Sequence, residues 1–225
     1  MSLVIKDKVA VNIAMLGTSA LIIQPDGEQT IDIQRRIWAM GHAVEQWAGV
    51  REIVFGMTNL MVVCETHIPS PEAFSEQLTA EWHRSDAALT EVRLIEIPTT
   101  YGGELAVDIE GLIERTGLDL AAIAQLHAGS IYDVFAVGSA PGFAYLGGLN
   151  PRLFMPRKKT PSLRIEKGSL TIGGMQTAIS SLTGPNGWNA IGCCDVELFD
   201  ISKDHPCLLA PGDRIRFVID KVEAG

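Results

Sequence analysis

Six cations are concentrated in one short stretch of an otherwise acidic chain. Residues 152–167 contain Arg152, Arg157, Lys158, Lys159, Arg164 and Lys167, with Glu166 as the one acid between them. The whole chain has 18 Lys and Arg against 27 Asp and Glu, which gives a net charge of −9. Cations gathered in this way are typical of a site for a carboxylate or a phosphate. An ordinary solvated loop is the alternative.

A second chemical feature is the glycine-rich aromatic segment over residues 141–148. It contains Phe143 and Tyr145 together with one proline, which restricts the backbone, and three glycines, which give it freedom. Such a segment can form a cleft wall, with aromatic surface for stacking and backbone that a ligand approaches closely, Gly142 in particular. A tight barrel corner with buried aromatics is the alternative. Further candidate partners for a ligand lie in glycine-bounded segments: Gln176, Thr177, Trp188 and Asn189.

His127 is the candidate general acid or base. It lies near the end of a helix that begins at Asp119, where a histidine more often interacts with the helix dipole. The adjacent pair Cys193 and Cys194, followed by His205 and Cys207, does not have the usual zinc-ligand spacing. We therefore expect no metal site.

Composition excludes several classes of protein. An acidic chain lacks the basic face of a nucleic-acid-binding protein. Its longest apolar runs are far below the roughly 20 residues that span a bilayer, so no membrane segment is expected. Four cysteines in 225 residues form no disulfide framework, and residues 1–8 lack the apolar core of a signal peptide. We expect a soluble, cytoplasmic protein.

The elements that must position these residues fall into two groups. Apolar spacing and turn residues predict a hairpin over residues 9–24, a helix over 33–47, strands over 51–55 and 59–65, a helix that begins at Ser70-Pro71, and a strand over 91–97. This βαββαβ order with one leading strand is that of a ferredoxin-like unit. We assign residues 1–97 to that domain.

Residues 98–225 differ from the first domain in their content of turn residues and in the length of their predicted strands. Two short helices capped by Asp108 and Asp119 precede a strand over residues 131–137. Residues 138–192 then contain 10 Gly and 5 Pro in 55 positions, and a last strand covers 214–219. Short strands with dense turn residues favour an all-β barrel or sandwich. The expected fold class is therefore α+β, in two domains.

At the same residues the chain resembles a known family. The shared motifs, in order, are Tyr101-Gly-Gly103, Leu126-His127, Tyr132, residues 141–147, Pro151-Arg152, Pro156-Arg157, Gly168-Ser169, residues 172–174, Gln176-Thr177, Gly187-Trp188, Ile191-Gly192, Leu198-Phe199 and residues 211–213. They are similar to the B subunit of bacterial ATP-dependent 5-oxoprolinase. That family has also been labelled allophanate hydrolase subunit 1 (carboxyltransferase domain, subdomains C and D), and it includes the sporulation-kinase inhibitor KipI.

The resemblance implies a ferredoxin-like N-terminal domain and a cyclophilin-like β-barrel C-terminal domain. It also implies hydrolysis of a cyclic amide with ATP as co-substrate, together with Mg²⁺ and no tightly bound cofactor. The partners would be a sister C subunit and an A subunit, and the chain would be inactive alone. His127 would be catalytic, and the substrate or nucleotide would contact Tyr132, Gly142, Phe143, Tyr145, Arg157, Gln176, Thr177, Trp188 and Asn189.

Two other functions remain open. One is inhibition of a histidine kinase, as KipI does, and the other is a carboxyltransferase-type subunit that acts on urea-derived substrates. The chain departs from the family's usual residues at Ser139, Ser162, Glu166-Lys167, Ala178, Asn186 and Cys193. Ser162 and Cys193 stand where the family usually has a cation, so the anion site is expected to rely on Arg157 and its neighbours.

Overall fold

The structure is a computed structural model that describes residues 9–86 and 92–223. It divides into two compact units, Met1–Thr90 and Glu91–Gly225. Each unit has a buried apolar core of its own. No helix of the described residues is both long enough and apolar enough to cross a bilayer.

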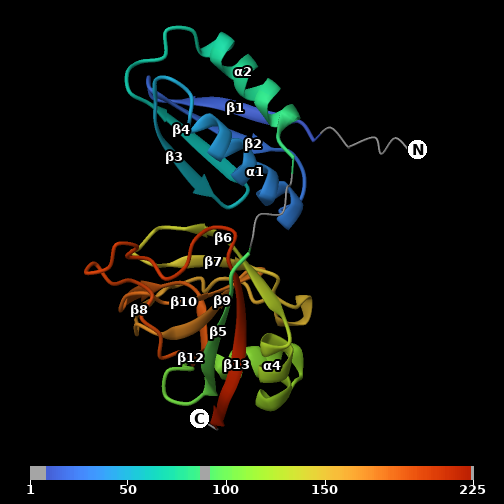
Figure 1. Cartoon of the computed structure of the whole chain (residues 1–225). Helices are drawn as coiled ribbons and strands as arrows, with labels where there is room; N and C mark the ends of the chain where they lie inside the picture. The colour runs from blue at the N-terminus through green and yellow to red at the C-terminus, as the bar shows by residue number, and fades with distance from the viewer. Residues whose placement is uncertain (1–8, 87–91, 224–225) are drawn as a thin grey trace. The chain divides into compact units, whose positions relative to one another are not determined.

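The N-terminal unit is a four-stranded antiparallel sheet with two helices on one face (Figure 1). In chain order its elements are β1 (Val11–Leu16), β2 (Ala20–Pro25), α1 (Ile31–Val44), β3 (Val50–Gly56), β4 (Asn59–Cys64) and α2 (Pro71–Arg84). The expected hairpin is present, since β1 pairs with β2 from Val11 opposite Pro25 to Leu16 opposite Ala20. Both expected helices are also present.

Strand order explains how this unit completes its sheet. The order is β1-β2-β4-β3, and the ferredoxin-like expectation is confirmed. The edge beside β2 is occupied by the leading strand β1, whereas the sequence pattern assigned the last strand of the unit to residues 91–97. The antiparallel edge that a βαββαβ unit needs is thus provided from the N-terminal side of the chain.

The helices of this unit bury one apolar stripe each. Thr30 caps α1 by accepting a hydrogen bond from the amide of Ile33 at 3.3 Å. In α2, Trp82 is fully buried and its indole N–H donates to the carbonyl of Val9 at 2.8 Å. Together with the strands, the stripes form one core: Leu21, Ile23, Ile37, Met40, Val44, Leu60, Val62, Leu78 and Trp82.

The C-terminal unit is built on a closed seven-stranded barrel in the order β10-β7-β6-β13-β5-β12-β9. These strands are β5 (Leu94–Gly102), β6 (Ile131–Val137), β7 (Ala144–Gly147), β9 (Ser169–Gly173), β10 (Gln176–Ile179), β12 (Asn189–Cys193) and β13 (Arg214–Glu223). A two-stranded ribbon, β8 (Ser162–Ile165) with β11 (Gly184–Asn186), and the 3₁₀ turn η1 (Pro151–Leu153) lie between them in the chain. The expected α+β class with a C-terminal β-barrel is confirmed.

The strand expected over residues 91–97 was assigned to the wrong domain, because most of it belongs to β5 of the barrel. Residue 91 lies outside the described residues, and the rest of that stretch begins β5. This strand pairs in parallel with β13, from Leu94 opposite Arg214 onward, and its end pairs with β12. Residues 94–97 are therefore barrel residues, and the two units divide at 90/91 rather than at 97/98. Local alternation marks a strand but does not show which sheet hydrogen-bonds to it.

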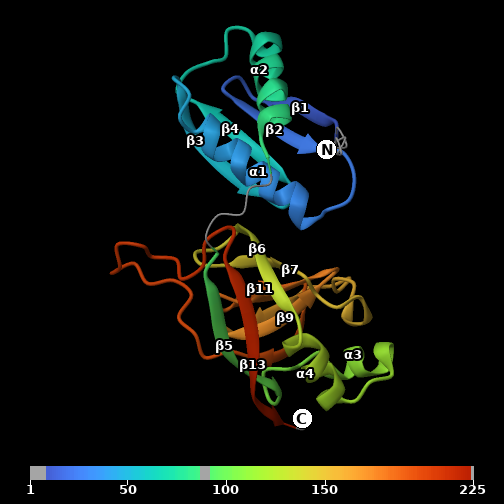
Figure 2. The same ribbon diagram turned by 45° about the vertical axis from the view of Figure 1, so that its right-hand side comes forward.

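Two short helices close one end of the barrel, α3 (Ile109–Thr116) and α4 (Leu120–Ala128), as Figure 2 shows. Asp119 caps α4 as the sequence predicts, because its side chain accepts from the amide of Ala122 at 2.8 Å. Asp108 precedes α3 but makes no capping bond to it. Its carboxylate is used elsewhere, as described below.

Candidate functional site

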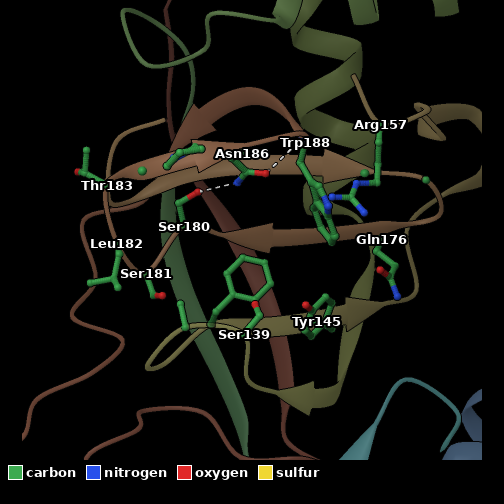
Figure 3. A pocket seen from close by; sticks show the side chains of 16 residues that line it. Ser139, Tyr145, Arg157, Gln176, Ser180, Ser181, Leu182, Thr183, Asn186 and Trp188 are labelled. Carbon is green, nitrogen blue, oxygen red and sulfur yellow. Dashed lines mark hydrogen bonds between the residues drawn. The ribbon is translucent and has the colours of Figure 1, made fainter. Parts of the chain in front are cut away.

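A cavity of about 570 Å³ opens in the C-terminal unit (Figure 3). It lies over one side of the barrel, against β7, the turn between β9 and β10, and the β11 ribbon. The lining residues are Ser139, Ala140, Phe143, Tyr145, Arg157, Gly173, Gly174, Gln176, Ser180, Ser181, Leu182, Thr183, Gly184, Pro185, Asn186 and Trp188. Its size is within the range of about 300–1,000 Å³ that is usual for small-molecule sites.

Three aromatic side chains form one wall of the cavity. Phe143 contacts Tyr145 edge-to-face with ring centroids 5.0 Å apart, and Trp188 lies 6.0 Å and 6.2 Å from the two rings. Trp188 is only 7% exposed. Its indole rests on Gly173, where a Cβ atom would be 2.4 Å from the ring. The structure thus brings together three predicted site residues as an apolar, rigid surface.

Arg157 and Gln176 lie near each other at one end of this cavity (Figure 3). Within residues 9–86 and 92–223 the guanidinium of Arg157 makes no ion pair. No Asp or Glu is among the described residues that line the cavity. An unpaired guanidinium beside a primary amide, with aromatic walls and no competing carboxylate, suits a small anion.

Three of the other cations of the basic stretch are paired elsewhere. Lys158 contacts Asp108 at 2.6 Å, Arg164 contacts Glu166 at 2.5 Å, and Lys167 contacts Glu197 at 2.7 Å. Of the six cations, only Arg157 lines the cavity. The expected cluster therefore contributes one cation to the cavity, while Arg152 and Lys159 are exposed and lie outside its lining. The acidic partners of Lys158 and Lys167, which are Asp108 and Glu197, lie 50 and 30 residues away in the sequence. A count of charges within the basic stretch therefore did not include them.

The Lys158–Asp108 contact holds the backbone next to Arg157. The ammonium of Lys158 also contacts the hydroxyl of Ser162 at 2.7 Å, and the amide of Lys158 donates to Gly187 O at 2.7 Å. Asp108 accepts in addition from the amide of Ala190 at 2.8 Å. Anchoring Lys158 at both its main chain and side chain restricts where the preceding Arg157 can point.

His127 lies in the barrel core and not in the cavity. It is fully buried, and Nδ1 lies 2.8 Å from the hydroxyl of Tyr101 while Nε2 lies 3.0 Å from the hydroxyl of Thr177. Thr177 donates its own proton to the carbonyl of Thr171 at 2.9 Å, so it accepts from His127. These bonds assign the Nε2–H tautomer, with Tyr101 donating to Nδ1.

Burial also fixes the protonation of this group. Desolvation lowers the pKa of His127 to about 3 and raises the pKa of Tyr101 and Tyr132 above that of free tyrosine. Tyr132 donates to the carbonyl of His127 at 2.8 Å. The expected catalytic role of His127, and the expected ligand contacts of Tyr132 and Thr177, therefore have no support in this geometry. The three residues crosslink α4 to the barrel strands.

Two further predicted residues also serve the fold. Asn189 is 4% exposed and donates to the carbonyls of Pro156 and Ile172, at 3.0 Å and 3.1 Å. Gly142 has φ +73°, and a Cβ there would be 2.7 Å from the carbonyl oxygen of Leu198. Close backbone approach at Gly142 is thus real, but the approach is to the main chain of Leu198 and not to the cavity, whose lining does not include Gly142.

The end of the cavity away from Arg157 was missed by the sequence analysis. It is lined by small polar residues, of which Ser139 and Asn186 were noted only as departures from the family pattern and Ser180, Ser181 and Thr183 not at all. Ser139 has a left-handed backbone with φ 63°. The sequence signal was weak because serine and threonine are common in turns.

The paired cysteines form no site with His205. Cys194 is buried and lies 3.4 Å from the Thr99 hydroxyl, and burial raises its pKa to about 12. Across the described ranges, no three His, Cys, Asp or Glu side chains gather where they could hold a metal ion.

Comparison with known proteins agrees with this architecture. Residues 11–209 match the family described as carboxyltransferase domain, subdomain C and D. The B subunit of 5-oxoprolinase from Escherichia coli O157:H7 is 36% identical over 211 residues, which cover 92% of this chain and 95% of the relative. The protein of the same name from Haemophilus influenzae is 35% identical over 214 residues, covering 94% and 99%.

Solved structures show the same fold within longer chains. The crystal structure of TTHA0988 has a TM-score of 0.74 and 29% identity, over 92% of this chain and 40% of that one. The Kluyveromyces lactis urea carboxylase has a TM-score of 0.79 at 18% identity, over 97% of this chain and 22% of that one. Because the family match covers most of the chain and both relatives exceed 30% identity over nearly their full lengths, this chain belongs to the family of the carboxyltransferase domain, subdomain C and D.

Proposed function

We propose that this chain is the B subunit of an ATP-dependent 5-oxoprolinase and that its cavity binds a small cyclic amide that carries a carboxylate. The names of the relatives support the reaction class. The single observation that carries the proposal is the unpaired guanidinium of Arg157 in an aromatic-walled cavity that has no lining carboxylate among the described residues. A carboxylate is the ligand group that such a site holds best.

Each cavity residue then has a defined task. Arg157 binds the carboxylate through two N–H donors, and Gln176 offers a donor and an acceptor to the ring amide. Phe143, Tyr145 and Trp188 exclude water from the bound ring and so strengthen the polar contacts. No histidine and no acid of the described ranges lines the cavity, so the base that activates water comes from outside this chain.

ATP is the co-substrate: the amide oxygen would attack the γ-phosphorus, ADP would leave, and the phosphorylated amide carbon would become open to attack by water. Mg²⁺ would arrive with the nucleotide, because the described cavity lining has no carboxylate that could hold it. The sister C subunit supplies the rest of the site and the A subunit completes turnover, in the cytoplasm. Exposed apolar side chains beside the cavity suit such a partner: Leu163 is 89% exposed, Leu182 56% and Met175 52%.

The test is phosphate release with 5-oxoproline, measured for this chain alone, for the reconstituted pair with the sister subunit, and for the pair with the A subunit. We expect negligible release from the chain alone and 5-oxoproline-dependent release from the larger assemblies. Arg157→Gln should abolish that dependence, whereas Lys159→Gln, an exposed neighbour outside the cavity, should not. Full turnover by the chain alone would contradict a shared site.

A docking role toward a histidine kinase is the second candidate, and the same exposed leucines favour it. A pair that assembles but stays inactive with 5-oxoproline and with urea-derived amides, while this chain inhibits a kinase autophosphorylation assay, would replace the enzymatic proposal. Leu163→Ser together with Leu182→Ser should then relieve the inhibition.

A further inference from the structure

The polar end of the cavity has no role in binding a small cyclic amide acid. Arg157 and Gln176 lie at one end, and the labelled side chains Ser180, Ser181 and Thr183 lie at the other (Figure 3). A cavity of about 570 Å³ is large enough for drug-sized ligands. A small acid held by Arg157 therefore leaves the polar end for a second group.

One hydroxyl at this end needs a partner. Ser181 is 4% exposed, and its Oγ has no hydrogen-bond partner among the described residues. A buried hydroxyl left unpaired destabilises the fold, because it has given up its hydrogen bonds to water. Folded proteins satisfy most such groups, so an exception beside a cavity indicates a hydroxyl that a ligand would satisfy.

The backbone around Ser181 offers further donors. In the described part of the chain, the amides of Ser181 and Leu182 donate to no backbone carbonyl. Ser139 lines the cavity as well, with its backbone in the left-handed region. Its amide is likewise without a backbone acceptor among residues 92–223. Hydroxyl and backbone N–H donors are groups that hold phosphates in proteins. Glu166, the carboxylate that accepts from Thr183 at this end at 3.0 Å, is itself paired with Arg164.

We propose that the end of the cavity formed by Ser139, Ser181 and Leu182 binds a phosphate group, separately from the carboxylate at Arg157. The proposal deepens the proposed function and rests on it for the identity of the small acid. Phosphate bound here would face the same aromatic wall as the amide. The cavity would then hold both reactants of a phosphate-dependent amide reaction side by side.

Binding to the full chain tests this directly by calorimetry with inorganic phosphate, and in a second arm with a non-hydrolysable ATP analogue. Ser181→Ala should weaken phosphate binding about tenfold, as expected for a lost hydrogen bond to a charged group. The same variant should keep or raise the melting temperature, because it removes an unsatisfied hydroxyl. Weaker binding with undiminished stability cannot come from misfolding.

Ser139→Gly is a second variant, since glycine accepts φ 63° without strain. It should also weaken phosphate binding. Arg157→Gln should change phosphate affinity by only about twofold, the effect of one charge acting at a distance through water, while 5-oxoproline binding weakens by about tenfold or more. The analogue arm distinguishes the sources: a dependence on Ser181 for both probes indicates a nucleotide phosphate, and for inorganic phosphate alone indicates the free ion.

The proposal is overturned if the wild-type chain binds neither probe at millimolar concentration. It is equally overturned if Arg157→Gln abolishes phosphate binding while Ser181→Ala and Ser139→Gly leave it unchanged, because the phosphate would then occupy the Arg157 end. Absence of 5-oxoproline binding alongside Ser181-dependent phosphate binding would remove the proposed function and leave the phosphate site standing.

Discussion

Lys158 lies 2.6 Å from a carboxylate oxygen of Asp108, 50 residues earlier in the chain. Its neighbour Arg157 has no such partner within the described ranges and lines the cavity. Two adjacent cations therefore have different surroundings: Lys158 fixes the backbone and Arg157 lines the cavity.

The ion pair between Lys158 and Asp108, called the clamp below, predicts a stability loss for Asp108→Asn. Both side chains are mostly buried, 16% and 21% exposed, so Lys158 would keep its charge with a weaker partner. We expect a loss of about 1–3 kcal/mol in unfolding free energy, measured by urea denaturation. The matched control is Glu166→Gln, whose partner Arg164 is 72% exposed, and which should leave the unfolding free energy nearly unchanged because water screens an exposed ion pair. Equal effects in the two variants would contradict the clamp.

Arg157 should determine affinity for small carboxylates without affecting the fold. Arg157→Gln removes the cation from the cavity, and we expect the dissociation constant of 5-oxoproline to rise by about tenfold or more, the value of a charge-assisted hydrogen bond. Its melting temperature should stay near that of the wild type, because the side chain is exposed and makes no ion pair in the described part. Calorimetry measures both. An unchanged dissociation constant would remove Arg157 from the site.

Trp188 keeps the aromatic wall in place by resting on Gly173. A methyl group in Gly173→Ala would be 2.4 Å from the indole, so the ring must shift. We expect a destabilisation of about 1–3 kcal/mol, as for other overpacked sites, and a change in tryptophan fluorescence. Gly184→Ala is the control, because Gly184 also lines the cavity but a Cβ there meets nothing within 4 Å. Similar spectra and stabilities for both variants would contradict the packing argument.

Burial of neutral His127 predicts an acid-sensitive barrel. The folded pKa is about 3, below the unfolded value of about 6.5, so only the unfolded chain gains a proton between these values. Stability is therefore complete above pH 6.5 and falls as the pH decreases toward 3, by about 2 kcal/mol at pH 5 from this group. Urea denaturation at pH 7.5 and pH 5 measures the loss.

Two measurements assign that loss to His127. Nitrogen NMR at pH 5 should show the neutral Nε2–H tautomer for this residue in the folded protein, which needs no variant. His205→Gln removes an exposed histidine and should keep the same loss between the two pH values. A charged imidazolium at His127 at pH 5 would contradict the assignment.

Local patterns in the sequence were sufficient for most elements. Helix α1 follows from apolar spacing, α4 from the cap at Asp119, and the β1–β2 hairpin from a break at Gly17. Each depends on contacts within a few residues, which is the range over which capping and periodicity act. The aromatic residues of the cavity wall were found in the same way, from an unusual local density of aromatics and glycines.

The sequence pattern of β10 did not show which of its residues face the cavity and which face the core. Gln176 lines the cavity, while the next residue, Thr177, points into the core and bonds to His127. Successive side chains of a strand must point to opposite sides, yet both residues are polar. Nothing in their types distinguishes the ligand contact from the core hydrogen bond, so both were predicted as site residues.

By itself, the sequence determined the two-part α+β organisation, the helices with the Asp119 cap of α4, and the segments from which a site could be built. Only the tertiary structure decided that β5 pairs with β13, that His127 is a buried neutral crosslink, and that Arg157 is the one of the six cations that lines the cavity. The physical reason is the sequence separation between the groups that interact. Strand partners, ion-pair partners and desolvation depend on groups tens of residues away, such as Asp108 for Lys158, and no local periodicity records where those groups will meet.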